Sequence, residues 1–308
     1  MSVQCLACGN DATLHGNFLP FETAYLQHEW QQNSVILQAG SLYVCKHCNI
    51  WFRNPYAKQS DLATFYNQIP NAVWSEPIDK PYWQTIRKTI KNYTEGKNIL
   101  DVGCYMGDFL GFLDANYQKF GIEPSAYAQN IATQKGITIL GNTIEDTHLV
   151  PESLDAIIML DVLEHVQTPM QILENYYQGL KKDGLLVLAT GATETTFFNF
   201  FAQYYWYANI SMHCTFYSLS WFRWLTTKIP FQIVDYQYFS AGEKLSSYSF
   251  VKQLLIKSLY IIHHKNKETF WAKHLFKLPY LNLIPKMLNV PWLISAKDQI
   301  LIFLQKTK

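Results

Sequence analysis

The sequence predicts an α/β protein with a doubly wound, mostly parallel sheet that follows a small cysteine-rich ribbon. Three stretches support this fold class: a strand, glycine turn and helix start at residues 98–113, an apolar run at 154–160, and two C-x-x-C pairs before residue 50. A strand that ends at a glycine turn and enters a helix is the first half of a βαβ unit. Near-continuous apolar runs are typical of parallel strands that are covered on both faces.

The composition is that of a globular protein with a sizeable core. The chain has 308 residues, of which 49% are apolar and 16% charged, enough for one large domain and a small one. A net charge of +1 gives no argument for a nucleic-acid partner. The first ten residues lack the basic region and apolar run of a signal peptide, and no stretch reaches the roughly 18 apolar residues of a membrane span. We therefore expect a cytoplasmic protein.

Four of the six cysteines fall in two C-x-x-C pairs: Cys5, Cys8, Cys45 and Cys48. Two such knuckles a few dozen residues apart are typical of a zinc site with four thiolate ligands. Gly9 and Asn49 follow the second cysteine of each pair and tolerate the left-handed backbone that a zinc knuckle needs. Disulfides are disfavoured in a reducing cytosol, and a redox C-x-x-C would not come twice. We expect a structural Zn²⁺ that folds the ribbon and does not catalyse.

The glycine turn after the first core strand has an informative spacing. It lacks the third glycine of a dinucleotide fingerprint and the Lys-Ser/Thr of a phosphate-binding loop. The run Asp101-x-Gly103-Cys104-x-x-Gly107 resembles motif I of class I S-adenosylmethionine (SAM)-dependent methyltransferases. The resemblance implies that this turn passes under the methionine part of SAM and that Asp101 helps to anchor its amino group. Tyr105 stands where many members carry a middle glycine.

The next two predicted strands supply further cofactor-binding candidates. The first ends in Glu123, about twenty residues beyond the glycine turn, where a carboxylate can accept hydrogen bonds from both ribose hydroxyls. NAD enzymes share this acid, so Glu123 indicates a nucleoside without distinguishing SAM from NAD. The turn at residues 142–146 resembles the adenine-binding turn of the methyltransferase family. Ile144 is the backbone candidate there, with Thr143 and Glu145 as weaker ones.

The most specific pattern comes later, in DAIIMLDVLEHVQTPMQIL at residues 155–173 and LKKDGLLVL at 180–188. It resembles the SAM-dependent family closely and favours SAM over NAD, and the resemblance runs from about residue 82 to 238. It implies a Rossmann-like α/β fold with a seven-stranded sheet, closed by strands at residues 231–236 and 298–304, the last of them antiparallel. A ribbon followed by such a core is similar to sugar C-methyltransferases and glycan-cluster methyltransferases.

Three polar residues follow the strand at 154–160 and should lie at the mouth of the sheet: Asp161, Glu164 and His165. Asp161 is a further cofactor-binding candidate. Glu164 and His165 could fix the loop by hydrogen bonds, or this pair could take part in catalysis with His165 as a general base. The run Asp161-x-x-Glu164-His165 is also similar to the E-x-x-E-H metal motif of small-RNA 2′-O-methyltransferases and ubiquinone-pathway O-methyltransferases, which implies a second divalent metal. His213 could complete that metal site, act as a second base, or cap the next helix.

A lysine-rich insertion separates the last two predicted strands. Residues 244–291 hold eight lysines and the single acid Glu268, and residues 252–262 look like a basic amphipathic helix. Such a helix can cap the substrate pocket, which we favour, or lie on a membrane surface. The predicted units are a ribbon and linker at 1–78, the core at 79–240, the insertion at 241–294 and the last core strand at 295–308.

These observations predict a SAM-dependent methyltransferase. The expected acceptor is a hydroxyl of a small molecule, a sugar nucleotide, or a glycan or lipid-linked intermediate, with O-methylation favoured and C-methylation as a second route. No nucleic-acid acceptor is favoured, because the aromatic stretch at residues 197–207 has no interleaved arginine or lysine. The alternative is a catalytically weak SAM-binding, zinc-ribbon interaction protein.

Overall fold

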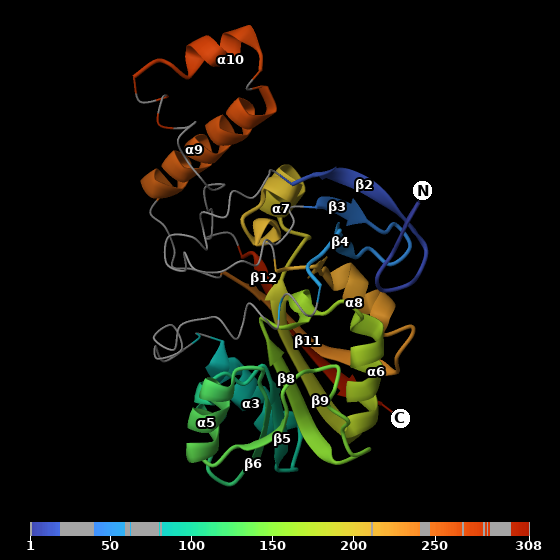
Figure 1. The fold of residues 1–308 in the computed structure, drawn as a ribbon. Coiled ribbons are helices and arrows are strands. Elements are labelled where there is room, and N and C mark those ends of the chain that lie inside the picture. The colour runs from blue at the N-terminus through green and yellow to red at the C-terminus, as the bar shows by residue number, and fades with distance from the viewer. Residues whose placement is uncertain are drawn as a thin grey trace.

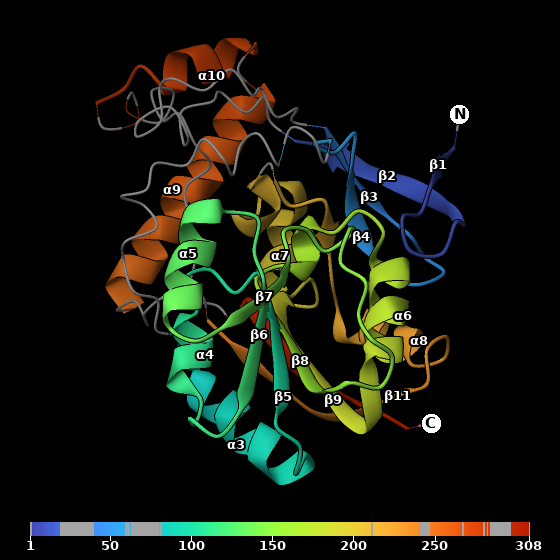
Figure 2. The ribbon, with the colours of Figure 1, turned by 60° about the horizontal axis from the view of Figure 1, so that its bottom comes forward.

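The computed structural model describes residues 2–18, 40–58, 62, 80, 82–210, 212–240, 247–266, 268–279, 281, 283 and 297–307. Within them, a seven-stranded sheet lies between two layers of helices, and a smaller five-stranded sheet lies beside it (Figures 1 and 2). Two of the predicted unit boundaries, 78/79 and 294/295, lie outside the described residues, and the third, at 240/241, lies at their edge.

The central sheet has the strand order β11-β12-β9-β8-β5-β6-β7. Its strands are β5 (Asn98–Val102), β6 (Gln118–Ile122), β7 (Thr138–Gly141), β8 (Leu154–Leu160), β9 (Leu180–Gly191), β11 (Phe231–Phe239) and β12 (Gln299–Lys306). The strands from β5 to β9 pair in parallel, and Leu100 of β5 lies between Phe120 of β6 and Ile157 of β8. β12 is antiparallel to both of its neighbours. The predicted seven-stranded sheet with an antiparallel last strand is confirmed.

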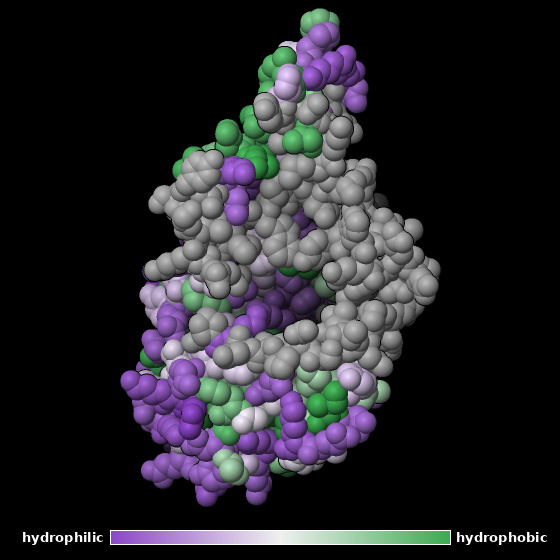
Figure 3. Space-filling model, turned by 90° about the vertical axis from the view of Figure 1, so that its left-hand side faces the viewer, coloured by the Kyte–Doolittle hydropathy of each residue, from purple (hydrophilic) through white to green (hydrophobic). Residues whose placement is uncertain are grey.

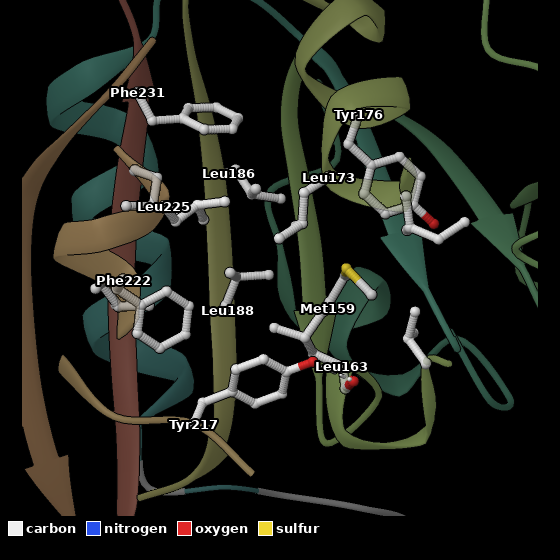
Figure 4. Close-up of a cluster of buried hydrophobic side chains, with 14 of the residues drawn as sticks. Met159, Leu163, Leu173, Tyr176, Leu186, Leu188, Tyr217, Phe222, Leu225 and Phe231 are labelled. Atoms are coloured by element: carbon white, nitrogen blue, oxygen red, sulfur yellow. Dashed lines mark hydrogen bonds between the residues drawn. The ribbon is translucent and has the colours of Figure 1, made fainter. Parts of the chain in front are cut away.

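Helices cover both faces of this sheet because alternate strand residues point to opposite sides. In the described part of the chain, these layers contain α3 (Trp83–Tyr93), α4 (Asp108–Phe112), α5 (Ala126–Gln134), α6 (Pro169–Gly179) and α8 (Leu219–Leu225). Val187 of β9 belongs to the apolar cluster with α3 and α4, whereas its neighbours Leu186 and Leu188 belong to the cluster with α6 and α8. Figure 4 shows the second cluster, in which Leu173 and Phe222 reach toward β8 and β9 from two helices.

Local signals explain where several helices begin. The Ser125 hydroxyl accepts a hydrogen bond from the Ala128 N–H, so the sequence starts α5 with a good N-cap residue. Ser218 caps α8 in the same way through the Trp221 N–H. Pro169 occupies the first turn of α6, where its missing N–H costs no hydrogen bond.

The ribbon sheet contains one strand from the core. It has the order β1-β2-β3-β4-β10 and consists of β1 (Val3–Gln4), β2 (Asp11–Asn17), β3 (Ser41–Val44), β4 (Trp51–Asn54) and β10 (Thr215–Phe216). β10 pairs antiparallel with β4, with Thr215 opposite Phe52. Ile50 and Phe52 also belong to the same apolar cluster as Tyr217 and Trp221 of the core. The ribbon and the core therefore share one sheet and one hydrophobic cluster.

Two further segments lie near the carboxyl ends of the core strands. The aromatic stretch contains α7 (Thr196–Phe201) and the 3-10 turns η3 (Ala202–Tyr204) and η4 (Tyr207–Asn209), and another such turn, η2 (Leu163–His165), follows β8. The insertion contains α9 (Ser247–Asn266) and α10 (Phe270–Leu275), which project from the body in Figure 1. Among the helices that can be described, none has the length and apolar character that crossing a bilayer would take.

Candidate functional site

A cavity of about 340 Å³ lies at the carboxyl ends of β5, β6 and β8. Ligands in open α/β sheets sit at this edge, beyond the strand ends. Seven of the eight residues predicted to bind the cofactor line it: Asp101, Gly103, Cys104, Glu123, Ile144, Glu145 and Asp161. His165 lines it as well, whereas Gly107, Glu164 and His213 are not among its lining residues. The structure therefore brings most of the predicted site to a single hollow.

The glycine turn approaches the cavity with its backbone. Gly103 has φ +73°, and a Cβ there would lie 2.6 Å from Cγ2 of Val162, so the chain has no room for a side chain at this point. Tyr105, which replaces the family's middle glycine, has φ +54° and keeps the left-handed backbone of that position. Gly107 also has positive φ, and a Cβ there would clash with Ile137. Gly107 lets the start of α4 pack closely against Ile137, and its contact with a cofactor stays a prediction.

Glu123 is held in a fixed orientation at the end of β6. Its Oε2 accepts the Tyr105 N–H at 2.9 Å, and its Oε1 accepts the Ser125 N–H at 2.9 Å. Burial raises the pKa of this carboxyl, and the two N–H donors oppose that rise. Each oxygen keeps a second lone pair, so the carboxylate can still accept from a ligand's hydroxyls.

Two more carboxyls line the same cavity. Asp101 is buried in β5, and burial together with the neighbouring Glu123 charge holds its pKa well above the ordinary value. A cationic group beside Asp101 would offset this cost, which fits the amino group of SAM. Asp161 lies 3.5 Å from Lys80 Nζ and accepts a hydrogen bond of 3.4 Å from Gln299. Burial raises the pKa of Asp161, and Lys80 lowers it.

The turn after β7 forms another wall of the cavity and is fixed from within. The Thr143 hydroxyl donates to Asp146 at 2.8 Å, and the Thr143 carbonyl accepts from Thr147 at 2.6 Å. Asn142, Thr143, Ile144 and Glu145 all line the cavity. The hydroxyl and the carbonyl of Thr143 are already paired inside the turn, so they hold its shape. Ile144 lies at the cavity, and the contact of its backbone with adenine stays a prediction.

Glu164 and His213 lie together below the cavity wall. Glu164 is buried, and its Oε2 accepts the Thr190 hydroxyl at 2.9 Å. His213 is also buried, with Nε2 4.0 Å from Glu164 Oε1 and Nδ1 3.0 Å from the Tyr207 carbonyl. Because a carbonyl only accepts, Nδ1 carries the proton and the neutral Nε2 faces Glu164. His213 therefore sits behind the cavity, with its ring 4.8 Å from that of His165.

Burial dominates the protonation of these three groups. It raises the pKa of Glu164 to about 8, with a further rise from the Asp161 charge. It lowers the pKa of His165 to about 4 and that of His213 well below 6.5. Both histidines are thus neutral at pH 7, and His165 at the cavity wall is able to accept a proton.

Among the residues that the structure describes, two groups of side chains have the spacing of metal ligands. Glu164, His165 and His213 offer ligand atoms within 4.8 Å of one another. Asp161, expected from the sequence as the first ligand, is not a member of this group. The second group consists of the four paired cysteines, whose sulfurs also lie within 4.8 Å of one another.

The four-cysteine group matches tetrahedral zinc. The sulfurs of Cys5 and Cys48 are 3.6 Å apart, and those of Cys8 and Cys45 are 3.5 Å apart. Zn–S bonds of about 2.3 Å place tetrahedral sulfurs roughly 3.8 Å from one another. The residue after each knuckle, Gly9 and Asn49, has positive φ as predicted, at +71° and +61°. These residues could hold a zinc ion.

Arg53 ties the ribbon to the His213 segment. Its buried guanidinium donates to the carbonyls of His213 at 3.1 Å, Ala208 at 2.6 Å and Ile210 at 3.3 Å. Its backbone N–H donates to the Cys214 carbonyl at 2.8 Å. A residue of the ribbon thus fixes the loop that carries a predicted catalytic histidine.

Sequence reasoning missed Lys80, Tyr82, Trp83 and Arg53. The first three line the cavity at the start of α3, before the glycine turn in the chain. Their signal was a lysine and two aromatic residues before the glycine turn, which alone does not indicate a ligand. Arg53 carried no signal, because its partners lie about 155 to 160 residues away along the chain.

Comparisons with known proteins show which family the chain resembles. Residues 80–236, about half of it, match the family described as "Methyltransferase domain". It is 34% identical over 107 residues to the ubiquinone biosynthesis O-methyltransferase of Actinobacillus pleuropneumoniae serotype 7, and 33% identical over 115 residues to that of Haemophilus ducreyi. These matches cover 31% and 33% of this chain and 46% and 49% of those proteins, so the chain spans about half the length of the curated relatives it matches.

A solved structure supports the same fold. Coclaurine N-methyltransferase, bound to N-methylheliamine and SAH, superposes with a TM-score of 0.50 at 13% identity, over 93% of this chain and 87% of that one. At this identity the likeness concerns the fold alone. The predicted SAM-dependent methyltransferase core is confirmed: the chain belongs to the methyltransferase domain family, and residues 80–236 form its methyltransferase domain.

Proposed function

We propose that this protein transfers the methyl group of SAM to a hydroxyl oxygen of a small molecule. The observation that carries the proposal is the single cavity in which the glycine turn, Glu123 and the turn after β7 meet, in a chain of the methyltransferase family. The two curated relatives are named as O-methyltransferases of ubiquinone biosynthesis, which supports oxygen as the acceptor atom. SAM, when bound, supplies a methyl group on a positively charged sulfur.

The chain's own part on the donor side is to bind and orient. We assign the amino group of the donor to Asp101, the ribose hydroxyls to Glu123 and the adenine edge to the Ile144 backbone. Gly103 lets the turn approach the donor closely, because any side chain there would meet Val162. Holding two reactants in line in this way can supply several kcal/mol of rate enhancement.

On the acceptor side we assign proton removal to His165. It lines the cavity, and burial lowers its pKa to about 4, so the ring is neutral at pH 7. This low pKa makes His165 a weaker base than an exposed histidine, and we assign to it the proton that the hydroxyl loses as its oxygen gains the methyl group. We assign His213 and Glu164 to positioning His165, because they lie directly behind it.

The acceptors expected from the sequence are more specific than a small-molecule hydroxyl. Sugar nucleotides and glycan or lipid-linked hydroxyls remain candidates beside phenols and quinols, and a carbon acceptor is the second route. Release of S-adenosylhomocysteine over a panel of these compounds distinguishes them. The alternative, an interaction protein that binds SAM without turnover, predicts donor binding with no release on any member or in a cell lysate.

We also propose a structural metal at the four cysteines and, as an alternative to His165 acting as base, a second metal at the histidine group. The four cysteines would hold a structural Zn²⁺, since the site has no open position. Glu164, His165 and His213 would hold a divalent ion that acidifies the acceptor hydroxyl, as an alternative to His165 acting as base. Activity that survives exhaustive chelation, in protein whose zinc remains bound, contradicts this second metal.

The test of the proposed function is isothermal titration with SAM, using Glu123→Gln. Replacing the carboxylate by an amide removes charge-assisted hydrogen bonds, each of about 1.5–3 kcal/mol, so we expect the Kd for SAM to rise about tenfold to a hundredfold. Glu95→Gln is the matched control, because Glu95 is exposed and lies outside the cavity lining. Equal affinity of the two variants contradicts the assigned ribose contact, and absence of SAM binding by the unaltered chain contradicts the function.

A further inference from the structure

The insertion helices α9 and α10 form a projecting arm with its own small apolar cluster. Tyr260 of α9 and Ala272 and Phe276, which lie in or directly after α10, are buried against one another. Figure 1 shows the arm standing away from the central sheet and the ribbon. We propose that this arm docks the protein on a membrane surface that carries anionic lipids. The proposal does not depend on the proposed methyl transfer.

Two faces of α9 are already used inside the protein. Leu254 and Ile261 pack against the aromatic cluster of α7 and the 3-10 turns, and Lys257 Nζ lies 5.0 Å from the centre of the Phe201 ring on that side. Ile256 and Leu259 pack on the α10 side of the helix. The orientation of α9 is therefore fixed, and so is the face that it presents outward.

The remaining face of α9 is apolar and exposed. Val251, Leu255 and Ile262 have 62%, 58% and 40% of their surface accessible. At about 100° per residue, positions i, i+4 and i+11 fall within roughly 40° of arc, so these side chains form one stripe. The start of α10 adds two large aromatic side chains, Phe270 at 78% and Trp271 at 47% exposure.

The charges beside these apolar side chains are nearly all positive. Lys252, Lys265, Lys273 and Lys277 are exposed, and Glu268 is the single acid among the arm residues that the structure describes. Figure 3 shows apolar and hydrophilic residues side by side on the arm. This charge is local, because the whole chain has a net charge of only +1.

This combination fits a bilayer surface better than a protein or a free anion. Aromatic and aliphatic side chains next to lysines are what an interfacial helix presents to lipid headgroups and the upper acyl chains. Phe270 and Trp271 are of the size and shape that anchor at this depth. The described helices are not apolar enough to cross the bilayer, so the arm would lie on the membrane and not span it.

Vesicle co-sedimentation of the full chain tests the proposal. We expect binding to vesicles of phosphatidylcholine with phosphatidylglycerol, and at least tenfold weaker binding to phosphatidylcholine alone or in high salt. Phe270→Ser with Trp271→Ser, and separately Lys273→Glu with Lys277→Glu, should each weaken binding about tenfold or more. All four side chains are exposed, so the variants should fold, and circular dichroism checks this.

Matched controls separate the arm from general surface effects. Val150→Ser removes an exposed apolar side chain of the core, and Lys97→Glu with Lys182→Glu reverses two exposed charges there. Both should bind vesicles as the unaltered chain does. The proposal is overturned if the unaltered chain does not bind anionic vesicles, or if arm and control variants lose vesicle binding equally. It is also overturned if the arm variants change the oligomeric state in light scattering, because a second copy of the chain would then cover the apolar surface of the arm. Vesicle binding tests the membrane proposal and SAM titration tests the proposed function, so the failure of one can be told from the failure of the other.

Discussion

Gly103 is the residue of the cavity wall with the strictest steric requirement. Its φ of +73° and the 2.6 Å approach of Val162 to a Cβ both oppose any side chain. We expect Gly103→Ala to lower the free energy of unfolding by about 1–3 kcal/mol and to weaken SAM binding. Gly111→Ala is the matched control in α4, where no atom lies within 4 Å of an added Cβ, and it should stabilise by up to about 1 kcal/mol. Urea unfolding of both variants measures this, and similar losses would contradict the steric account.

Burial of His213 predicts how the free energy of unfolding depends on pH. Burial holds its pKa well below 6.5, so on acidification the unfolded chain takes up a proton there that the folded chain does not. The stability contributed by neutral His213 is therefore present above pH 6.5 and is lost as the pH falls below it. We expect His213→Gln to destabilise more at pH 7.5 than at pH 5, measured by urea unfolding without added divalent metal. A destabilisation that grows toward pH 5 contradicts this sign.

The two-residue strand β10 connects the ribbon to the segment after β8, to which we assign the acceptor chemistry. It pairs with β4 of the ribbon, and the Thr215 hydroxyl donates to the Leu163 carbonyl at 3.2 Å, next to Glu164. The Cys214 N–H donates to the Glu164 carbonyl at 2.8 Å. The ribbon therefore reaches the segment after β8 through this strand, and it acts as part of the site's scaffold.

Arg53 on β4 tests this connection between elements. Arg53→Met leaves the carbonyls of His213, Ala208 and Ile210 without their buried donor, and we expect a loss of about 2–4 kcal/mol of unfolding free energy. Arg87→Met is the control, because Arg87 pairs with Asp114 near the surface and should cost about 1 kcal/mol or less. Faster hydrogen exchange of residues 207–217 in Arg53→Met alone is the accompanying signature. Equal losses in the two variants would argue against the connection.

The sequence predicted those elements whose signals are local. The parallel strands are continuous apolar runs, Glu123 follows its strand at the expected distance, and Gly9 and Asn49 adopt the left-handed backbone. β10 was not predicted, because two residues are too short to show a period. Lys80 and Arg53 were missed because each interacts with residues that are far away along the chain, which no local pattern reveals. The sequence therefore predicted most of the residues that line the cavity around the glycine turn, β6 and β7, whereas it could not predict how the His213 segment is arranged.

At the scale of the whole molecule, the ribbon and the methyltransferase core bury a common interior. Cys5, Cys45 and Cys48 belong to the same apolar cluster as Tyr217 and Trp221. Two domains joined only by a linker would keep separate cores and unfold separately. Here the loss of the ribbon would expose core residues to water, so the zinc that we propose at the four cysteines would be linked to the stability of the core.

Removal of the metal should therefore destabilise the entire chain in one step. We expect the unaltered chain to bind about one zinc ion per chain and Cys45→Ser, which lacks one of the four thiolates, to lose it. Because the metal's binding free energy is folding free energy, the single calorimetric transition should move to lower temperature as a whole. Cys104→Ser is the control for zinc content, since Cys104 lies at the cavity and outside the four-cysteine group. Two transitions in Cys45→Ser, of which the larger stays at its original temperature, would mean that the ribbon and the core fold independently in spite of their shared cluster.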